Sequence, residues 1–248
     1  MTAYQNATLN SDLTTPPTLD YGAIGNGRVL ALISPSSAID WLCLPRFDSP
    51  SVFGRLLDRE KGGTFRFLVE DQEIRGNLSY VPNTNVLVTR FEHKDTCWEL
   101  LDFAPRIPEG LTVLAPIKIV RLLRPIKGRP RLRVDFDPRP DYARAKVQLM
   151  QTTCGIEIVG GNIPLTLIAN IPIPYILNKQ EFLLNQPIFF IFSHKYREGL
   201  PNLIGVQQDL DLTIAGWRAW VKTCALPTFA PKEVLRSALC LKIGRAHV

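Results

Sequence analysis

The residues best equipped for chemistry lie close together, between Asp40 and Phe53. This run of fourteen residues reads DWLCLPRFDSPSVF and holds two carboxylates, an arginine and several aromatic rings. A glycosidase needs one protonated carboxylic acid at the leaving oxygen and one ionised carboxylate across the sugar ring. Aromatic faces and an arginine can also hold a sugar without cleaving it. The candidate site residues are therefore Asp40, Trp41, Arg46, Phe47 and Asp48.

Both carboxylates of this run also have a structural interpretation, which we favour over catalysis. Asp40 can anchor the end of a strand. Asp48, followed by Ser49 and Pro50, is typical of a turn that starts a helix, here leading into residues 52–57. From the residues alone, a structural role for both carboxylates is thus favoured over direct catalysis.

The aromatic and basic residues of the run leave two interpretations open. Trp41, Arg46 and Phe47 could bind a sugar ring, or they could anchor the docking of another domain. We favour docking, because Trp and Arg are the residue types that most often carry an interface. A loop that docks beside an active site could do both. A second acidic, aromatic and basic segment, 102–106 (DFAPR), could contact or support the first.

Other kinds of site find little support in the sequence. The chain has three histidines and five widely spaced cysteines, without a CxxC pair, an HExxH, a GxSxG or a phosphate-binding loop. We therefore expect no metal, no cofactor and no disulfide. The N-terminus shows no secretory signal, and no apolar run is long enough to span a membrane. These features predict a cytoplasmic protein with reduced thiols and no membrane partner.

The basic charge balance does not by itself indicate a nucleic-acid partner. The formal net charge is +6 and the isoelectric point is about 9.2, but overall charge reports on solubility rather than on a site. The densest basic run, residues 118–133, alternates cations with apolar residues around a turn at 125–130. This pattern predicts a hairpin with one solvated, charged face. We expect no nucleic-acid partner, since no recognition motif accompanies the run.

Most of the chain alternates polar and apolar residues with a period of two, as strands do. Two pairs of strands are expected to be hairpins, 29–33 with 39–44 and 85–91 with 96–101. Further candidate strands are 64–69, 117–123, 131–136, 146–150, 155–159, 165–169 and 188–192. Strands this numerous and this regularly spaced predict a mainly β fold, a large antiparallel sandwich.

The pattern changes near residue 209, where two helices are expected. The first, residues 211–222, would begin near Asp211. Its apolar face would consist of Leu212, Ala215, Ala219 and Val221. The second, residues 231–242, starts with proline at a favoured first-turn position. Because it is too apolar for a lone surface helix, we expect it to pack on a neighbouring domain.

Several segments together resemble the start of the bacterial and archaeal glucoamylases and trehalases of glycoside hydrolase family 15. They are 21–28 (YGAIGNGR), 39–53, 56–58 with 62–63, 80–87 (YVPNTNVL), 101–106 (LDFAPR), 217–220 (WRAW) and 234–242. The resemblance extends from about residue 18 to 242. One departure is 35–38 (PSSA), where the family usually has a glycine-containing turn.

The resemblance implies a definite organisation. In such enzymes an N-terminal β-supersandwich precedes an (α/α)6 barrel, which carries both catalytic glutamates and hydrolyses terminal α-linked glucose with inversion. On this basis we expect a flexible leader at 1–17, a β-sandwich domain at 18–208 and a linker helix at 209–226. Residues 227–242 would be the first helix of a truncated barrel, and 243–248 a non-native tail.

The expected function follows from that organisation. The chain would be a non-catalytic N-terminal domain, inactive alone, because the catalytic glutamates would lie beyond Val248. Its partner would be the missing catalytic barrel of the same polypeptide, with α-glucosides as candidate ligands. The alternative is a free-standing β-sandwich module that binds α-glucans through Trp41, Arg46 and Phe47. Specificity for trehalose or for maltooligosaccharides would depend on barrel loops that this sequence does not contain.

Overall fold

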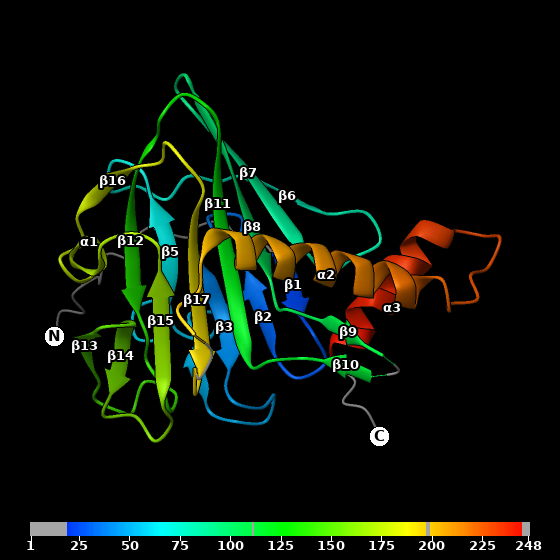
Figure 1. Cartoon of the computed structure of the whole chain (residues 1–248), viewed down its shortest axis with the longest axis horizontal. Helices are drawn as coiled ribbons and strands as arrows, with labels where there is room; N and C mark the ends of the chain where they lie inside the picture. Colours follow the sequence, from blue (N-terminus) through cyan, green and yellow to red (C-terminus); the bar gives the residue numbers. More distant parts are fainter. Residues whose placement is uncertain (1–18, 111, 197–198, 245–248) are drawn as a thin grey trace, which may run out of the picture.

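The computed structural model describes residues 19–110, 112–196 and 199–244, so the expected leader and residues 245–248 of the expected tail lie outside the described residues. The fold is mainly β, as the alternation predicts, with two long helices at the C-terminal end (Figure 1). Every named pair of neighbouring strands is antiparallel.

The larger layer is an eight-stranded sheet of order β13-β14-β15-β17-β11-β8-β7-β6. In that order its strands are Gln148–Thr152, Gly155–Val159, Leu165–Ala169, Ile188–His194, Lys118–Lys127, Thr96–Phe103, Leu87–His93 and Asn77–Tyr80. The predicted hairpin of β7 and β8 is confirmed, with His93 paired to Thr96.

Smaller sheets face this layer. One has four strands in sequence order: β1 (Gly22–Gly25), β2 (Leu30–Ile33), β3 (Ile39–Cys43) and β4 (Ser51–Phe53). Another consists of β16 (Glu181–Leu183), β12 (Arg131–Asp137) and β5 (Thr64–Leu68), with the short helix α1 (Ile173–Leu177) against β12. A two-stranded ribbon, β9 (Ile107–Glu109) and β10 (Thr112–Leu114), forms a sheet of its own. The predicted pairing of β2 with β3 is confirmed.

The main core fills the space between the layers with aromatic rings. Phe65 lies 5.2 Å from Phe136 and 5.8 Å from Phe190, ring centre to ring centre, and both contacts are edge-on. Phe53 and Phe192 extend the cluster at 5.5 Å. Edge-to-face contacts between aromatic rings stabilise the fold beyond the free energy that is gained by burying the rings. The cluster therefore fixes β4, β5, β12 and β17 against one another.

The strand β4 overturns one prediction. Residues 52–57 were expected to begin a helix, yet Ser51–Phe53 pair with β3 and turns follow. Phe53 is fully buried in the aromatic cluster, and the pairing of Phe53 with Leu42 holds the backbone extended. The turn predicted at Asp48 and Ser49 is present before the strand.

The basic run at 118–133 also differs from its prediction. Its two strands lie in different sheets, because β11 pairs with β8 and β17 while β12 pairs with β5 and β16. They therefore form no hairpin. The charged face is not fully solvated either, since Lys118 and Arg121 are buried. Lys118 makes an ion pair with Asp209 at 3.1 Å.

Arg121 joins the layers from inside the core. Its guanidinium and the carboxylate of Asp102 are both fully buried and meet at 2.8 and 3.2 Å. The same guanidinium donates to the backbone carbonyls of Ser37, in the turn between β2 and β3, and of Phe65 on β5. Such a pair is tolerated in the interior only when its hydrogen bonds are satisfied.

The helix α2 (Leu203–Val221) crosses the outer face of the large sheet (Figure 1). It begins earlier than predicted, because the Asn202 side chain accepts a hydrogen bond from the Gly205 amide and caps it. The predicted apolar face is wrong, since Leu212 is 43% exposed. The buried residues are Val206, Leu210, Thr213, Gly216 and Trp217.

The helix α3 (Pro231–Gly244) starts at the predicted proline and ends two residues later than expected. Only Leu239 and Ile243 of this helix are buried among its described residues. None of the described helices is long and apolar enough to cross a membrane.

Candidate functional site

The predicted candidate run divides between two environments. Asp40 lies on β3 and is buried, and Trp41 beside it is half-buried. Arg46 and Asp48 lie in the exposed loop that follows, where they pair with each other at 2.9 Å. Phe47 between them is 36% exposed. Asp48 pairs with Arg46, whereas Asp40 pairs with Arg55. The two acidic residues of the run therefore belong to separate charge clusters.

Asp40 lines a polar pocket of about 240 Å³. The Tyr21 hydroxyl donates to its carboxylate at 2.9 Å, and the Arg55 guanidinium lies at 3.5 Å. Burial raises the pKa of Asp40, against the opposing effect of Arg55. Burial, with the hydrogen bond to Asp40, also raises the pKa of Tyr21 to about 12. A carboxyl with a raised pKa is the kind of group that serves a glycosidase as general acid.

The other two carboxylates of this pocket, Asp20 and Glu73, are both paired with arginines. Asp20 lies 2.8 Å from Arg75. Glu73 pairs with Arg55 at 2.7 Å and also with Arg66. Arg66 in turn holds Asp135 at 2.8 Å, and Lys179 lies 3.1 Å from the same carboxylate. An inverting hydrolase needs an ionised carboxylate that can activate water, whereas two guanidiniums hold Glu73. The pocket suits a structural charge network better than hydrolysis.

The second predicted segment, 102–106, supports α2. The Arg106 guanidinium is buried 4.8 Å from the centre of the Trp217 ring and donates to the Asn26 carbonyl at 3.3 Å. Its backbone amide donates to the Thr213 hydroxyl at 3.1 Å. Burial lowers the pKa of Arg106. A cation over an indole face is favourable when desolvated, so this contact fixes the helix.

The helix α3 has its own docking site on the sandwich. The buried Asn85 side chain donates to the Leu239 carbonyl at 2.9 Å and accepts from the Arg236 guanidinium. Arg236 also donates to the Thr84 carbonyl at 2.8 Å and lies 3.9 Å from the centre of the Tyr80 ring. Side chains and a carbonyl of the sandwich thus bind a backbone carbonyl and an arginine of α3. We call Tyr80, Thr84 and Asn85 the helix-docking site.

The strand β1 completes the surroundings of this site. The Tyr80 hydroxyl bonds both backbone groups of Ala23, at 2.8 and 3.0 Å. Ile243 is fully buried against Gly25, at a spot where a Cβ atom would overlap it. Asn26 donates to two backbone carbonyls in the segments that flank the β9–β10 ribbon. Segments 21–28, 80–87 and 101–106, far apart in sequence, thus surround the C-terminal helices.

Docking is predicted from the sequence for residues 40–48, and the structure adds Asn85 and Arg236. Two signals were present: a polar Asn85 at the start of an apolar strand, and Arg236 inside an apolar helix. Pairing in the sheet β1–β4 places the loop after β3 at the same end as Gly25, where Ile243 packs. The docking role of that loop stays a prediction.

Comparison with known proteins places this arrangement in a family. A family model described as trehalase-like, N-terminal, matches residues 14–175. The trehalase of Thermoplasma volcanium is 28% identical over 255 residues, which cover 97% of this chain and 40% of that protein. Trehalase 1 of Sulfolobus acidocaldarius is 44% identical over 85 residues, covering 34% of this chain and 14% of the relative.

The chain therefore spans about 40% of the length of the Thermoplasma relative. The trehalase of Mycobacterium tuberculosis matches a shorter part, with 38% identity over 77 residues, 31% of this chain and 11% of that protein. The family match covers more than half of the chain and the segments that carry the docking contacts on the sandwich. The chain belongs to the trehalase-like N-terminal domain family.

Proposed function

We propose that this chain is the non-catalytic N-terminal domain of a cytoplasmic hydrolase of terminal α-linked glucose, and that it holds the helical catalytic unit of the same polypeptide. The observation that carries the proposal is the contact of Asn85 with Leu239 and Arg236, which fixes α3 to the sandwich. The relatives that the chain matches are trehalases more than twice its length. Trehalose and maltooligosaccharides are the corresponding candidate substrates.

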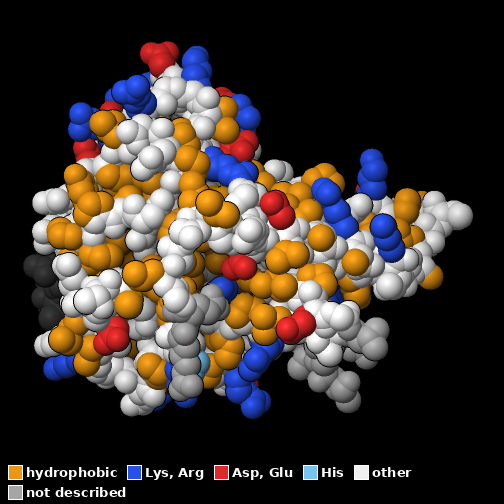
Figure 2. All heavy atoms as spheres, viewed as in Figure 1, with side chains coloured by type: hydrophobic (Ala, Val, Ile, Leu, Met, Phe, Trp, Pro, Cys, Tyr) orange, Lys and Arg blue, Asp and Glu red, His pale blue; other side chains and the backbone are white. Residues whose placement is uncertain are grey.

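The exposed face of the C-terminal helices supports a helical partner. Figure 2 shows hydrophobic side chains along the outward face of α2. Phe229 is 86% exposed, Leu241 75% and Val234 39%, although all three are apolar. Apolar residues that stay exposed close together mark interaction surfaces. The remaining helices of a barrel are the occupant that this proposal predicts.

Catalysis would then belong to the partner unit. An inverting mechanism requires two carboxyls with room for a water between them, and in this chain Glu73 is held by Arg55 and Arg66. The catalytic carboxylates are accordingly expected in the part of the full-length relatives that this chain does not cover. This domain would hold the catalytic unit in position and would supply no reacting group.

A glucose-release assay tests the proposal. The purified chain is incubated with trehalose, maltose and maltotriose beside an Asp40→Asn variant and a buffer blank. We expect no glucose above the blank from either protein. Release by the wild type that disappears in Asp40→Asn would place catalysis within this chain and overturn the proposal.

A further inference from the structure

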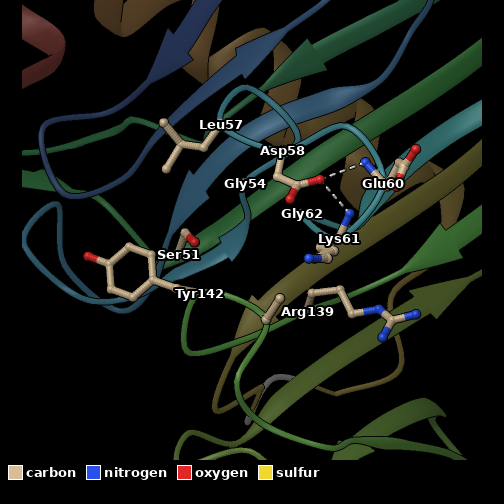
Figure 3. A pocket seen from close by; sticks show the side chains of 10 residues that line it. Ser51, Gly54, Leu57, Asp58, Glu60, Lys61, Gly62, Arg139 and Tyr142 are labelled. Carbon is tan, nitrogen blue, oxygen red and sulfur yellow. Dashed lines mark hydrogen bonds between the residues drawn. The ribbon is translucent and has the colours of Figure 1, made fainter. Parts of the chain in front are cut away.

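We propose that a second pocket of this domain binds a neutral sugar ring. The pocket has a volume of about 330 Å³ and opens beside β4 (Figure 3). Its volume lies at the lower end of the range of small-molecule sites. The walls that matter for recognition are Leu57, Asp58, Glu60, Lys61, Arg139 and Tyr142. The proposal that the sugar is an α-glucoside rests on the proposed function.

One side of the pocket is apolar although it faces solvent. Tyr142 is 49% exposed and Leu57 71%, and both lie on the same side in Figure 3. The Arg144 guanidinium lies 5.7 Å from the centre of the Tyr142 ring and is held by Asp141 at 2.6 Å. The ring is thus supported from outside the pocket. An exposed aromatic face held in place is suited to stacking on the C–H face of a pyranose.

The backbone that presents Tyr142 adopts an unfavourable conformation. Asp141, Tyr142 and Ala143 have φ angles of 57°, 53° and 63°, three successive left-handed residues without a glycine. Each such residue costs on the order of 1–2 kcal/mol. Hydrogen bonds hold the segment, from the Tyr142 amide to the Ser51 carbonyl at 3.3 Å and from the Ala143 amide to the Arg139 carbonyl at 3.1 Å. Backbone strain of this kind gathers at ligand sites.

The opposite side of the pocket supplies polar groups. The Asp58 carboxylate accepts from the Glu60 and Lys61 amides, both at 2.9 Å, which shapes the loop (Figure 3). Among the described residues, neither the Glu60 carboxylate nor the Lys61 ammonium has a hydrogen-bond or ion-pair partner. One acceptor and one donor of opposite charge match sugar hydroxyls. Because the charges of Glu60 and Lys61 offset each other, the pair favours a neutral ligand over an anion or a cation.

Close backbone packing keeps these two sides at a fixed separation. Gly62 lies against Gly54, where a Cβ atom would come within 2.3 Å of the backbone. The Arg139 amide donates to the Val52 carbonyl at 2.9 Å and joins the Tyr142 loop to β4. Asp58 and Gly62 thus shape the pocket, whereas the exposed Leu57 side chain serves neither the packing of this loop nor the docking of α3.

Isothermal titration of the 248-residue chain with maltose and trehalose tests the pocket. We expect a dissociation constant on the order of 1 mM for one of them. Tyr142→Ala should weaken binding about tenfold, since the stacking surface is lost. Tyr142→Phe keeps the ring and should bind like the wild type. Circular dichroism verifies that both variants are folded.

Phe47→Ala is the matched control, because it removes an exposed ring from the loop after β3 instead. Binding that Tyr142→Ala weakens and Phe47→Ala leaves unchanged supports the pocket. Binding that is lost only in Phe47→Ala, or no heat of binding with either sugar at about 20 mM, overturns it. That failure would leave the proposed function standing, since glucose release tests that proposal separately.

Discussion

At the scale of single residues, the two carboxylates of the run 40–53 have different partners. Asp40 and Asp48 are eight positions apart in one run, yet Asp40 pairs with Tyr21 and Arg55, and Asp48 with Arg46. Tyr21 lies just before β1 and Arg55 in the turn after β4, so the arrangement of the strands decides which charges meet. Sequence spacing predicts neighbours within a loop and cannot predict neighbours across a sheet.

The environment of Asp40 predicts a pH effect on stability. Burial raises its folded-state pKa above the unfolded value of about 3.9, so the folded protein favours the protonated form. The stabilisation from that proton is complete below the unfolded pKa and is lost as pH rises through the folded pKa. Asn cannot ionise, so Asp40→Asn should lose less stability than the wild type between pH 4 and pH 7.

Urea unfolding at the two pH values measures this difference. Asp48→Asn is the control, because the hydrogen bond from Arg46 lowers the pKa of that exposed carboxyl and its effect has the opposite sign. If the wild type instead gained stability relative to Asp40→Asn on going from pH 4 to pH 7, the buried carboxyl would be favoured in its charged form and this account of Asp40 would be wrong.

At the scale of elements, the alternation of polar and apolar residues predicted where the strands lie. It predicted less well which strands pair with each other. The hairpins β2–β3 and β7–β8 were predictable because their partners adjoin in sequence. The strands β11 and β12 also follow each other in sequence, yet they pair with strands of different sheets. The chain passes from one layer to the other between them. The face of α2 was mispredicted because close approach at Gly216, rather than the most apolar positions, determines which side is buried.

Two glycines of α2 give a contrasting pair of predictions. A Cβ atom at Gly216 would lie 2.8 Å from the Arg106 carbonyl oxygen and 3.2 Å from Pro108, so Gly216→Ala should cost about 1–3 kcal/mol. At Gly205 the nearest atom is 3.6 Å away, so Gly205→Ala should stabilise by up to about 1 kcal/mol through helix propensity. Urea unfolding measures the change in the free energy of unfolding for each variant. Equal stabilisation by both would show that α2 does not approach the ribbon closely.

At the scale of the whole molecule, segments that are far apart in sequence meet around the C-terminal helices. Asn85 and Arg236 are 151 positions apart, and Arg106 reaches both Asn26 and Trp217. The sequence could show that segments 21–28, 80–87 and 101–106 resemble a family. It could not show that they converge, because convergence depends on the order of strands in the sheets. Docking of α3 is therefore the central claim about this domain.

Hydrogen exchange of α3 tests that claim most directly. Asn85→Ala removes the bonds to the Leu239 carbonyl and to Arg236, and a lost buried hydrogen bond costs about 1–3 kcal/mol. Asn170→Ala is the matched control, since Asn170 also bonds two backbone groups, at 3.2 and 2.7 Å, but in a distant loop.

Mass spectrometry of peptides from residues 231–244 gives the answer. In the wild type and in Asn170→Ala we predict protected amides in α3. In Asn85→Ala the same amides should exchange about tenfold faster or more, while peptides from β8 and β11 stay protected. Equal exchange of α3 in Asn85→Ala and in the wild type would contradict the claim that the helix-docking site holds this helix.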